Sequence, residues 1–138
     1  MNRVTYISIV DDHIPFRKGM IVLINLFKDY QVLFEADNGR DLMEKIRPEL
    51  LPDIILLDII MPEMDGFETA RWLKESYPDI KILALSTMDS EAEIMRMIEY
   101  GAKGYILKDA DGEELKSAFE KLIRGDLHFS ENLFKSKK

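Results

Sequence analysis

Asp53-Ile-Ile-Leu-Leu-Asp58-Ile-Ile-Met-Pro62-Glu-Met-Asp65-Gly66 is the stretch of sequence that decides the fold. Its apolar run, 54–57, is rich in strand-forming residues and too short for a helix, which favours a strand buried on both faces of a parallel sheet. The run stops at Asp58 and enters a turn marked by Pro62 and Gly66. Open α/β sheets bind ligands at the carboxyl ends of central strands, but Asp also ends strands as an ordinary turn residue.

Strand-like and helix-like segments alternate along the rest of the chain. Short apolar segments predict five strands, at 4–10, 31–36, 53–58, 81–85 and 104–107. Apolar residues spaced three and four apart predict five helices between and after them, near 15–27, 42–46, 67–73, 90–100 and 112–123. Ser90 with Glu93 is predicted to form a capping box at the fourth helix, and Asp111 is predicted to open the fifth.

This alternation predicts an α/β fold, a single doubly wound domain with helices on both faces of a parallel five-stranded sheet. Right-handed crossovers leave few topologies, and the order 2-1-3-4-5 puts the ends of the first and third strands side by side. Asp11 and Asp12 would then meet Asp58 in one acidic cluster. Ser86 and Lys108 end the fourth and fifth strands, so they would lie on the same edge of the sheet.

Composition limits the class of protein. The chain of 138 residues is 46% hydrophobic and 33% charged, as expected of one globular domain, and its net charge of −7 argues against a nucleic-acid-binding surface within it. It contains no cysteine, which excludes disulfides and thiolate metal sites. The apolar segment 4–10 is too short for a signal peptide or a membrane span, so the expected location is cytoplasmic.

The predicted acidic cluster has a definite chemistry. Carboxylates held close together repel one another and attract a hard divalent cation, and oxygen ligands favour Mg²⁺. A carboxylate such as Asp58 can attack phosphorus to form an acyl phosphate. The ammonium of Lys108 and the hydroxyl of Ser86 would then contact the phosphoryl oxygens. Each residue taken alone is more simply a solvated side chain at a strand end, and the hypothesis rests on their joint occurrence on four strand ends.

The sequence resembles the receiver domain of two-component response regulators, a CheY-like, flavodoxin-like fold, over residues 4–125. The resemblance rests on the acid pair, the phosphoacceptor loop and the ends of the last two strands, namely Asp11-Asp12, Asp58, Met61-Pro62-x-Met64-Asp65-Gly66, Ser86 and Gly104-Tyr105-x-x-Lys108. Asp11-Asp12-His13 followed by Phe16-Arg-Lys-Gly is similar to the NarL/LuxR-type subgroup. Proteins of that subgroup carry a C-terminal helix-turn-helix DNA-binding domain.

The resemblance implies a role for each acidic residue. Asp58 matches the phosphoacceptor, which receives a phosphoryl group from a phosphohistidine on a sensor histidine kinase. Asp12 and Asp58 match the side-chain ligands of Mg²⁺, and the backbone carbonyl of Ile60 matches the third protein ligand. Asp11 would act on the Mg²⁺ mainly through water.

The resemblance also implies a conformational switch. Ser86 matches the hydroxyl that moves toward the phosphoryl group, and Lys108 matches its charged partner. Tyr105 matches the aromatic switch residue that turns inward when Ser86 moves, whereas without the resemblance it would be a half-buried strand residue with its hydroxyl in water.

Two departures from the family pattern bear on the chemistry. Many receivers have a proline in a cis peptide after the lysine, whereas Asp109 follows Lys108 here, and sequence leaves the cis or trans state open. Ile60 and Met88 are apolar at positions that in the family help to place the water that hydrolyses the acyl phosphate. We therefore expect slow dephosphorylation.

The resemblance implies a phosphorylatable receiver at residues 1–125 and a linker or tail at 126–138 that leads to a DNA-binding domain outside this chain. Its expected partners are a sensor histidine kinase and a second copy on phosphorylation, through the fourth helix–fifth strand–fifth helix face or the first and fifth helices. We expect no membrane partner and no turnover enzyme. The output would be transcription regulation.

Three other classes remain open to comparison. A phosphorylation-independent interaction module would be suggested by a missing Asp58, Lys108 or acid pair, and none is missing. Haloacid-dehalogenase-like phosphohydrolases carry a second Asp two residues after the nucleophile, where this chain has Ile60. A flavodoxin-like FMN carrier needs a phosphate-cradling loop after the first strand, where Asp11 and Asp12 would repel phosphate.

Overall fold

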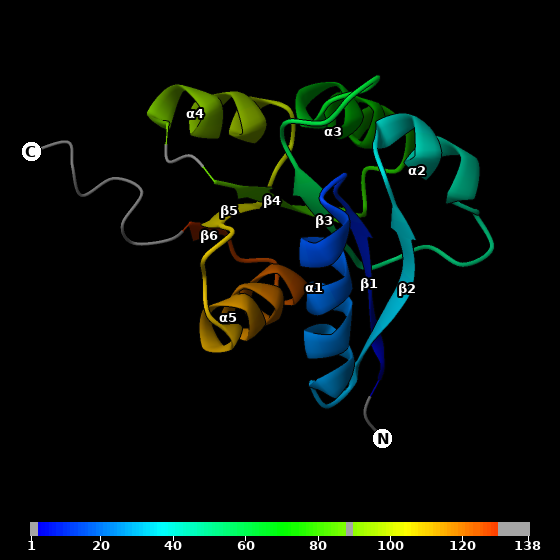
Figure 1. The fold of residues 1–138 in the computed structure, drawn as a ribbon, viewed down its shortest axis with the longest axis vertical. Helices are drawn as coiled ribbons and strands as arrows, with labels where there is room; N and C mark the ends of the chain where they lie inside the picture. Colours follow the sequence, from blue (N-terminus) through cyan, green and yellow to red (C-terminus); the bar gives the residue numbers. More distant parts are fainter. Residues whose placement is uncertain (1–2, 88–89, 130–138) are drawn as a thin grey trace, which may run out of the picture.

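A computed structural model describes residues 3–87 and 90–129 and shows a parallel sheet of six strands in the order β2-β1-β3-β4-β5-β6 (Figure 1). The order of the first five confirms the predicted 2-1-3-4-5 topology. The ends of each predicted strand lie within one residue of the ends of the observed strand. The strands are β1 (Thr5–Val10), β2 (Tyr30–Ala36), β3 (Ile54–Asp58), β4 (Lys81–Ser86), β5 (Gly104–Leu107) and β6 (His128–Phe129).

Helices cover both faces of the sheet, as the alternation of segments predicts (Figure 1). One face carries α1 (Ile14–Leu26) and α5 (Gly112–Ile123). The other carries α2 (Gly39–Lys45), α3 (Gly66–Ser76) and α4 (Glu91–Glu99). Within the described ranges, no helix has the length and apolar character to cross a membrane.

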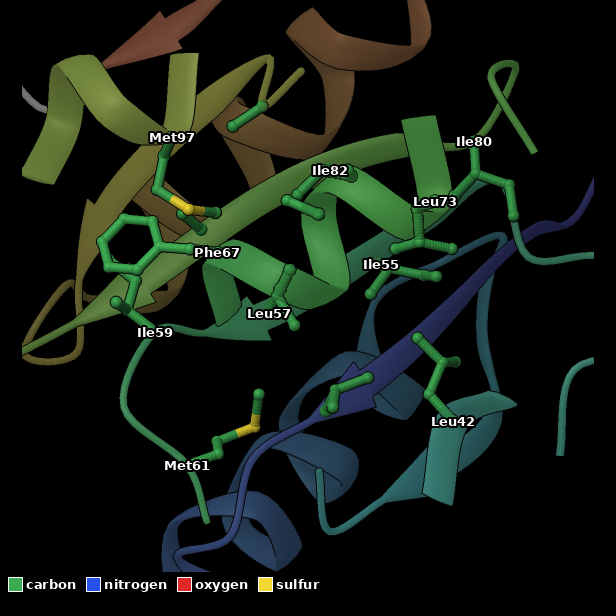
Figure 2. Close-up of a cluster of buried hydrophobic side chains, with 14 of the residues drawn as sticks. Leu42, Ile55, Leu57, Ile59, Met61, Phe67, Leu73, Ile80, Ile82 and Met97 are labelled. Atoms are coloured by element: carbon green, nitrogen blue, oxygen red, sulfur yellow. The ribbon is translucent and has the colours of Figure 1, made fainter. Parts of the chain in front are cut away.

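The central strand β3 is buried along its whole length and joins two hydrophobic cores. Ile55 and Leu57 point into the core under α2, α3 and α4, where Figure 2 shows them among side chains from all three of these helices. Ile54 and Leu56 point into the opposite core, under α1 and α5. Burial on both faces explains why the strand reads as a continuous apolar run instead of alternating polar and apolar residues.

The predicted five-stranded sheet is corrected to six strands. β6 pairs in parallel with β5 in a register that joins Gly104 to His128 and Tyr105 to Phe129. A Cβ added at Gly104 would lie 2.8 Å from the His128 carbonyl oxygen, so the glycine permits this close approach. Two residues carry no readable periodicity, which is why sequence assigned this stretch to a linker or tail. Residues 130–138 of that segment lie outside the described residues.

The helix starts differ in part from prediction. Asp111 accepts a hydrogen bond from Glu114 N at 2.8 Å, which confirms it as the N-cap of α5. Ser90 accepts one from Glu93 N at 3.4 Å, but the buried Glu93 Oε1 has no hydrogen-bond partner, so the predicted box is seen only in half. The complete capping box lies at α3, where the sequence predicts only a turn around Asp65.

Candidate functional site

Asp58 is the last residue of β3, and the loop after it holds the carboxyl in place. The residue is only 6% exposed, and Ile59 N donates to its Oδ1 at 2.9 Å. The chain then returns so closely that Gly66 N donates to the Ile59 carbonyl oxygen at 2.7 Å. A Cβ at Gly66 would lie 2.4 Å from the Asp58 carbonyl oxygen, so only glycine can begin α3 against the end of β3.

Asp11 and Asp12 follow β1, the strand that pairs with β3. One carboxylate oxygen from each of Asp11, Asp12 and Asp58 lies within 4.8 Å of the other two. Asp11 is fully buried, whereas Asp12 is exposed. The structure thus brings together the three carboxylates that strand-end position predicted, and it leaves one side of the cluster open to solvent.

Lys108 follows β5 and reaches across the sheet edge into the acidic cluster. Its Nζ lies 2.8 Å from Asp11 Oδ2 and 3.4 Å from Asp58 Oδ2, and its side chain is 13% exposed. The ammonium also lies 4.8 Å from the centroid of the Phe16 ring, a contact that sequence did not predict. Lys108 is therefore held as the cation of this site.

One ammonium does not neutralise the cluster. Burial, followed by the charge of Asp11, raises the pKa of Asp58 to about 7, although Lys108 and the Ile59 N–H act in the opposite direction. Asp11 Oδ2 is buried, and the ammonium of Lys108 is its only charged partner among the described contacts. Carboxylates that repel one another at an edge open to solvent fit a hard divalent cation such as Mg²⁺.

The other predicted residues lie around this cluster. Ser86 ends β4 and is 2% exposed, and its carbonyl oxygen accepts a hydrogen bond from Lys108 N at 2.8 Å. Tyr105 is fully buried among the side chains under α2, α3 and α4, not half-buried with its hydroxyl in water. The Ile60 side chain is 63% exposed. The Lys108–Asp109 peptide is trans.

Met88, named with Ile60 in the prediction of slow dephosphorylation, lies outside the described residues. The structure therefore describes only one of the two apolar neighbours.

Arg17, on α1, is a charged residue near the site, and sequence names it only within the motif Phe16-Arg-Lys-Gly, without a role. It is 6% exposed, and its guanidinium donates to Glu35, to Asp37 and to the carbonyl oxygen of Asp11. Burial would lower the pKa of Arg17, but the hydrogen bonds with Glu35 and Asp37 raise it above its usual value. The signal in sequence was weak: two acids flank Ala36 at the end of β2, far from Arg17 along the chain.

Comparison with known proteins agrees with this geometry. The sequence matches the model of the response regulator receiver domain over residues 7–120. It is 39% identical over 135 residues to the transcriptional regulatory protein YdfI of Bacillus subtilis, an alignment that covers 98% of this chain and 61% of that protein. It is 37% identical over 127 residues to the nitrate/nitrite response regulator protein NarL of Escherichia coli, with coverage of 92% and 58%. The chain thus spans about three fifths of the length of these relatives.

Solved structures show the same architecture. A LuxR-family two-component response regulator from Aurantimonas sp. superposes with a TM-score of 0.88 at 30% identity, covering 94% of this chain and 92% of that one. The receiver domain of NarL from Mycobacterium tuberculosis gives a TM-score of 0.81 at 33% identity, with coverage of 90% and 99%. The chain therefore belongs to the response regulator receiver domain family, and its relatives are NarL/LuxR-type regulators.

Proposed function

We propose that this receiver domain accepts a phosphoryl group on Asp58 from a phosphohistidine of a sensor histidine kinase. The observation that carries the proposal is the meeting of Asp58 with Asp11, Asp12 and Lys108 at the carboxyl edge of the sheet. A nucleophilic carboxylate, two further acids and a fixed ammonium are the groups that phosphoryl transfer to aspartate requires.

In the proposed step, a carboxylate oxygen of Asp58 forms a bond to phosphorus as the bond from phosphorus to the histidine nitrogen breaks. The imidazole nitrogen keeps the electron pair of that bond. Lys108, already 3.4 Å from Asp58 Oδ2, would neutralise charge on the phosphoryl oxygens, and the Ser86 hydroxyl would hydrogen-bond to one of them. The protein catalyses only its own phosphorylation and dephosphorylation, so we do not expect it to turn over a substrate.

The side chains of Asp11, Asp12 and Asp58, with the backbone carbonyl of Ile60, would hold Mg²⁺ for this reaction. When bound, the ion offsets the charge of the carboxylates and of the incoming phosphoryl oxygens. Asp12 is exposed, which leaves the site accessible from solvent. Asp11 is buried beside Lys108 and would act on the ion mainly through water, as the resemblance implies.

Phosphorylation would bias a conformational equilibrium through Ser86 and Tyr105. A phosphoryl group would add charge at Asp58 and attract the Ser86 hydroxyl, and the fully buried Tyr105 would respond to that movement. We infer that the output is transcription regulation through a separate C-terminal DNA-binding domain, because relatives that are longer than this chain are named as transcriptional regulators. We expect phosphorylation to favour a homodimer, through α4–β5–α5 or through α1 and α5.

The test is the intact mass of the protein after incubation with a small acyl-phosphate donor, with and without Mg²⁺. We expect one phosphoryl adduct that requires Mg²⁺ and is lost in Asp58→Asn. Asp79→Asn, which removes an exposed carboxyl that precedes β4, is the matched control and should be labelled like the wild type. No adduct on the wild type would favour a phosphorylation-independent interaction module, and sustained phosphate release would indicate a hydrolase.

A further inference from the structure

We propose that Arg17 is a positioning residue for the Mg²⁺ site. Its guanidinium fixes the peptide that joins Asp11 to Asp12 and thereby aims the Asp12 carboxylate into the acidic cluster. The inference rests on the proposed function, because it assumes that this cluster binds Mg²⁺.

The guanidinium of Arg17 is held by groups from two neighbouring strand ends. Nη1 donates to the Asp11 carbonyl oxygen at 2.5 Å and to Asp37 Oδ1 at 2.7 Å, and Nε donates to Glu35 Oε1 at 2.6 Å. A weaker contact at 3.4 Å joins Nη1 to the Ala36 carbonyl oxygen. A planar group anchored on both of its edges has one orientation, which a flexible ammonium with a single charged nitrogen cannot reproduce.

The Asp11 carbonyl connects Arg17 to the metal site because it belongs to the peptide that continues into Asp12. Before this peptide, Asp11 N donates to the Ala36 carbonyl oxygen at 3.0 Å. After it, His13 N donates to Asp11 Oδ1 at 2.8 Å. Arg17 adds the remaining constraint, on the carbonyl itself. Asp12 is exposed, and no side-chain contact within the described ranges orients its carboxylate, so the backbone sets the direction of its Cα–Cβ bond and with it the positions that the carboxylate can reach.

Glu35 and Asp37 make this buried cation tenable, because an unpaired charge there would be costly. Lys18 pairs with Glu35 as well, at 2.8 Å, but its side chain is 59% exposed and it does not touch Asp11. Lys18 therefore shares the carboxylate network of Arg17 without the contact to the peptide, and it offers a matched control.

The experiment is a calorimetric titration of Mg²⁺ into the full chain for the wild type, Arg17→Lys, Asp37→Asn and Lys18→Ala. Groups that orient metal ligands typically contribute about 10–100-fold in affinity, so we expect a Kd for Mg²⁺ raised about tenfold or more in Arg17→Lys. Asp37→Asn keeps the guanidinium but removes the negative charge from one of its acceptors, and it should shift the Kd less, in the same direction. Lys18→Ala should bind within about twofold of the wild type, since surface pairs contribute little.

Labelling with an acyl-phosphate donor separates positioning from general damage. In Arg17→Lys, the Mg²⁺ concentration that gives half the maximal labelling rate should rise by the same factor as the Kd, and saturating Mg²⁺ should restore the rate. Ile82→Val, in the core shown in Figure 2, lowers stability without touching the site and should leave the Kd unchanged.

Three results would overturn the inference. One is wild-type Mg²⁺ affinity in both Arg17→Lys and Asp37→Asn. Another is an equal loss in Ile82→Val, which would make the role of Arg17 purely structural. The third is a wild-type protein that binds no Mg²⁺. Of the three results, only this one would also contradict the proposed function.

Discussion

At the scale of single residues, the carboxyl of Asp58 is charged at a cost to the fold. Burial and then the charge of Asp11 raise its pKa from the ordinary 3.8 to about 7. Between these values the folded chain binds a proton more readily than the unfolded chain, so stability falls as pH rises. The contribution of Asp58 is thus fully present below about pH 4 and is lost as pH rises through about 7.

We therefore expect Asp58→Asn to raise the free energy of unfolding at pH 8, without Mg²⁺, by on the order of 2 kcal/mol. The gain should shrink toward zero near pH 4, where the wild-type carboxyl is protonated. Urea unfolding across this pH range in a chelating buffer measures it, with the exposed Asp79→Asn as the control. A gain that does not change with pH would contradict the prediction.

Strand-end position explains why most of the site could be predicted at this scale. Asp58, Asp11 and Lys108 each follow a recognisable apolar run, and the sheet order alone brings such positions together. Arg17 could not be found in this way, because its partners lie 18 and 20 residues further along the chain. No local pattern reports a contact that exists only after α1 has packed beside β2.

At the scale of elements, two helix starts that look alike in sequence differ in strength. Asp65 and Glu68 exchange hydrogen bonds of 2.9 and 3.2 Å at α3, whereas Ser90 accepts a single long one of 3.4 Å at α4. We expect Asp65→Ala to lower the free energy of unfolding by about 1–2 kcal/mol and Ser90→Ala by about 0.5 kcal/mol or less. Urea unfolding of both variants measures the difference, and equal losses would count against it.

Elements with a clear period were predictable, and those defined by tertiary pairing were not. The strand 104–107 and its neighbours show an apolar run with defined ends. β6 consists of two residues whose strand character comes only from hydrogen bonding to β5 and from the space that Gly104 leaves. Ser90–Glu93 and Asp65–Glu68 match the same capping pattern. The packing of the loop before each helix decides which pair forms both hydrogen bonds of a capping box.

At the scale of the whole molecule, β3 contributes side chains to both cores, so we expect the two cores to unfold together. Ile55 and Leu56 are neighbours in sequence but face opposite sides of the sheet. Ile55→Ala and Leu56→Ala should each lower the free energy of unfolding by about 2–5 kcal/mol. In each variant, the unfolding curve from Trp72 fluorescence should coincide with the one from circular dichroism.

Trp72 is the only tryptophan and packs against the core that contains Ile55. It therefore reports directly on one side of the sheet only. If Leu56→Ala separated the two curves, the cores on the two sides would be independent folding units.

The sixth strand also has a consequence for solubility. An outer strand with open N–H and carbonyl groups is a template on which other chains can add, and natural proteins protect such edges. β6 occupies the edge of β5 at Gly104 and Tyr105 with backbone from the same chain. Shortening the chain to residue 125 would remove this cover and open the backbone of Gly104 and Tyr105 to strand-to-strand aggregation.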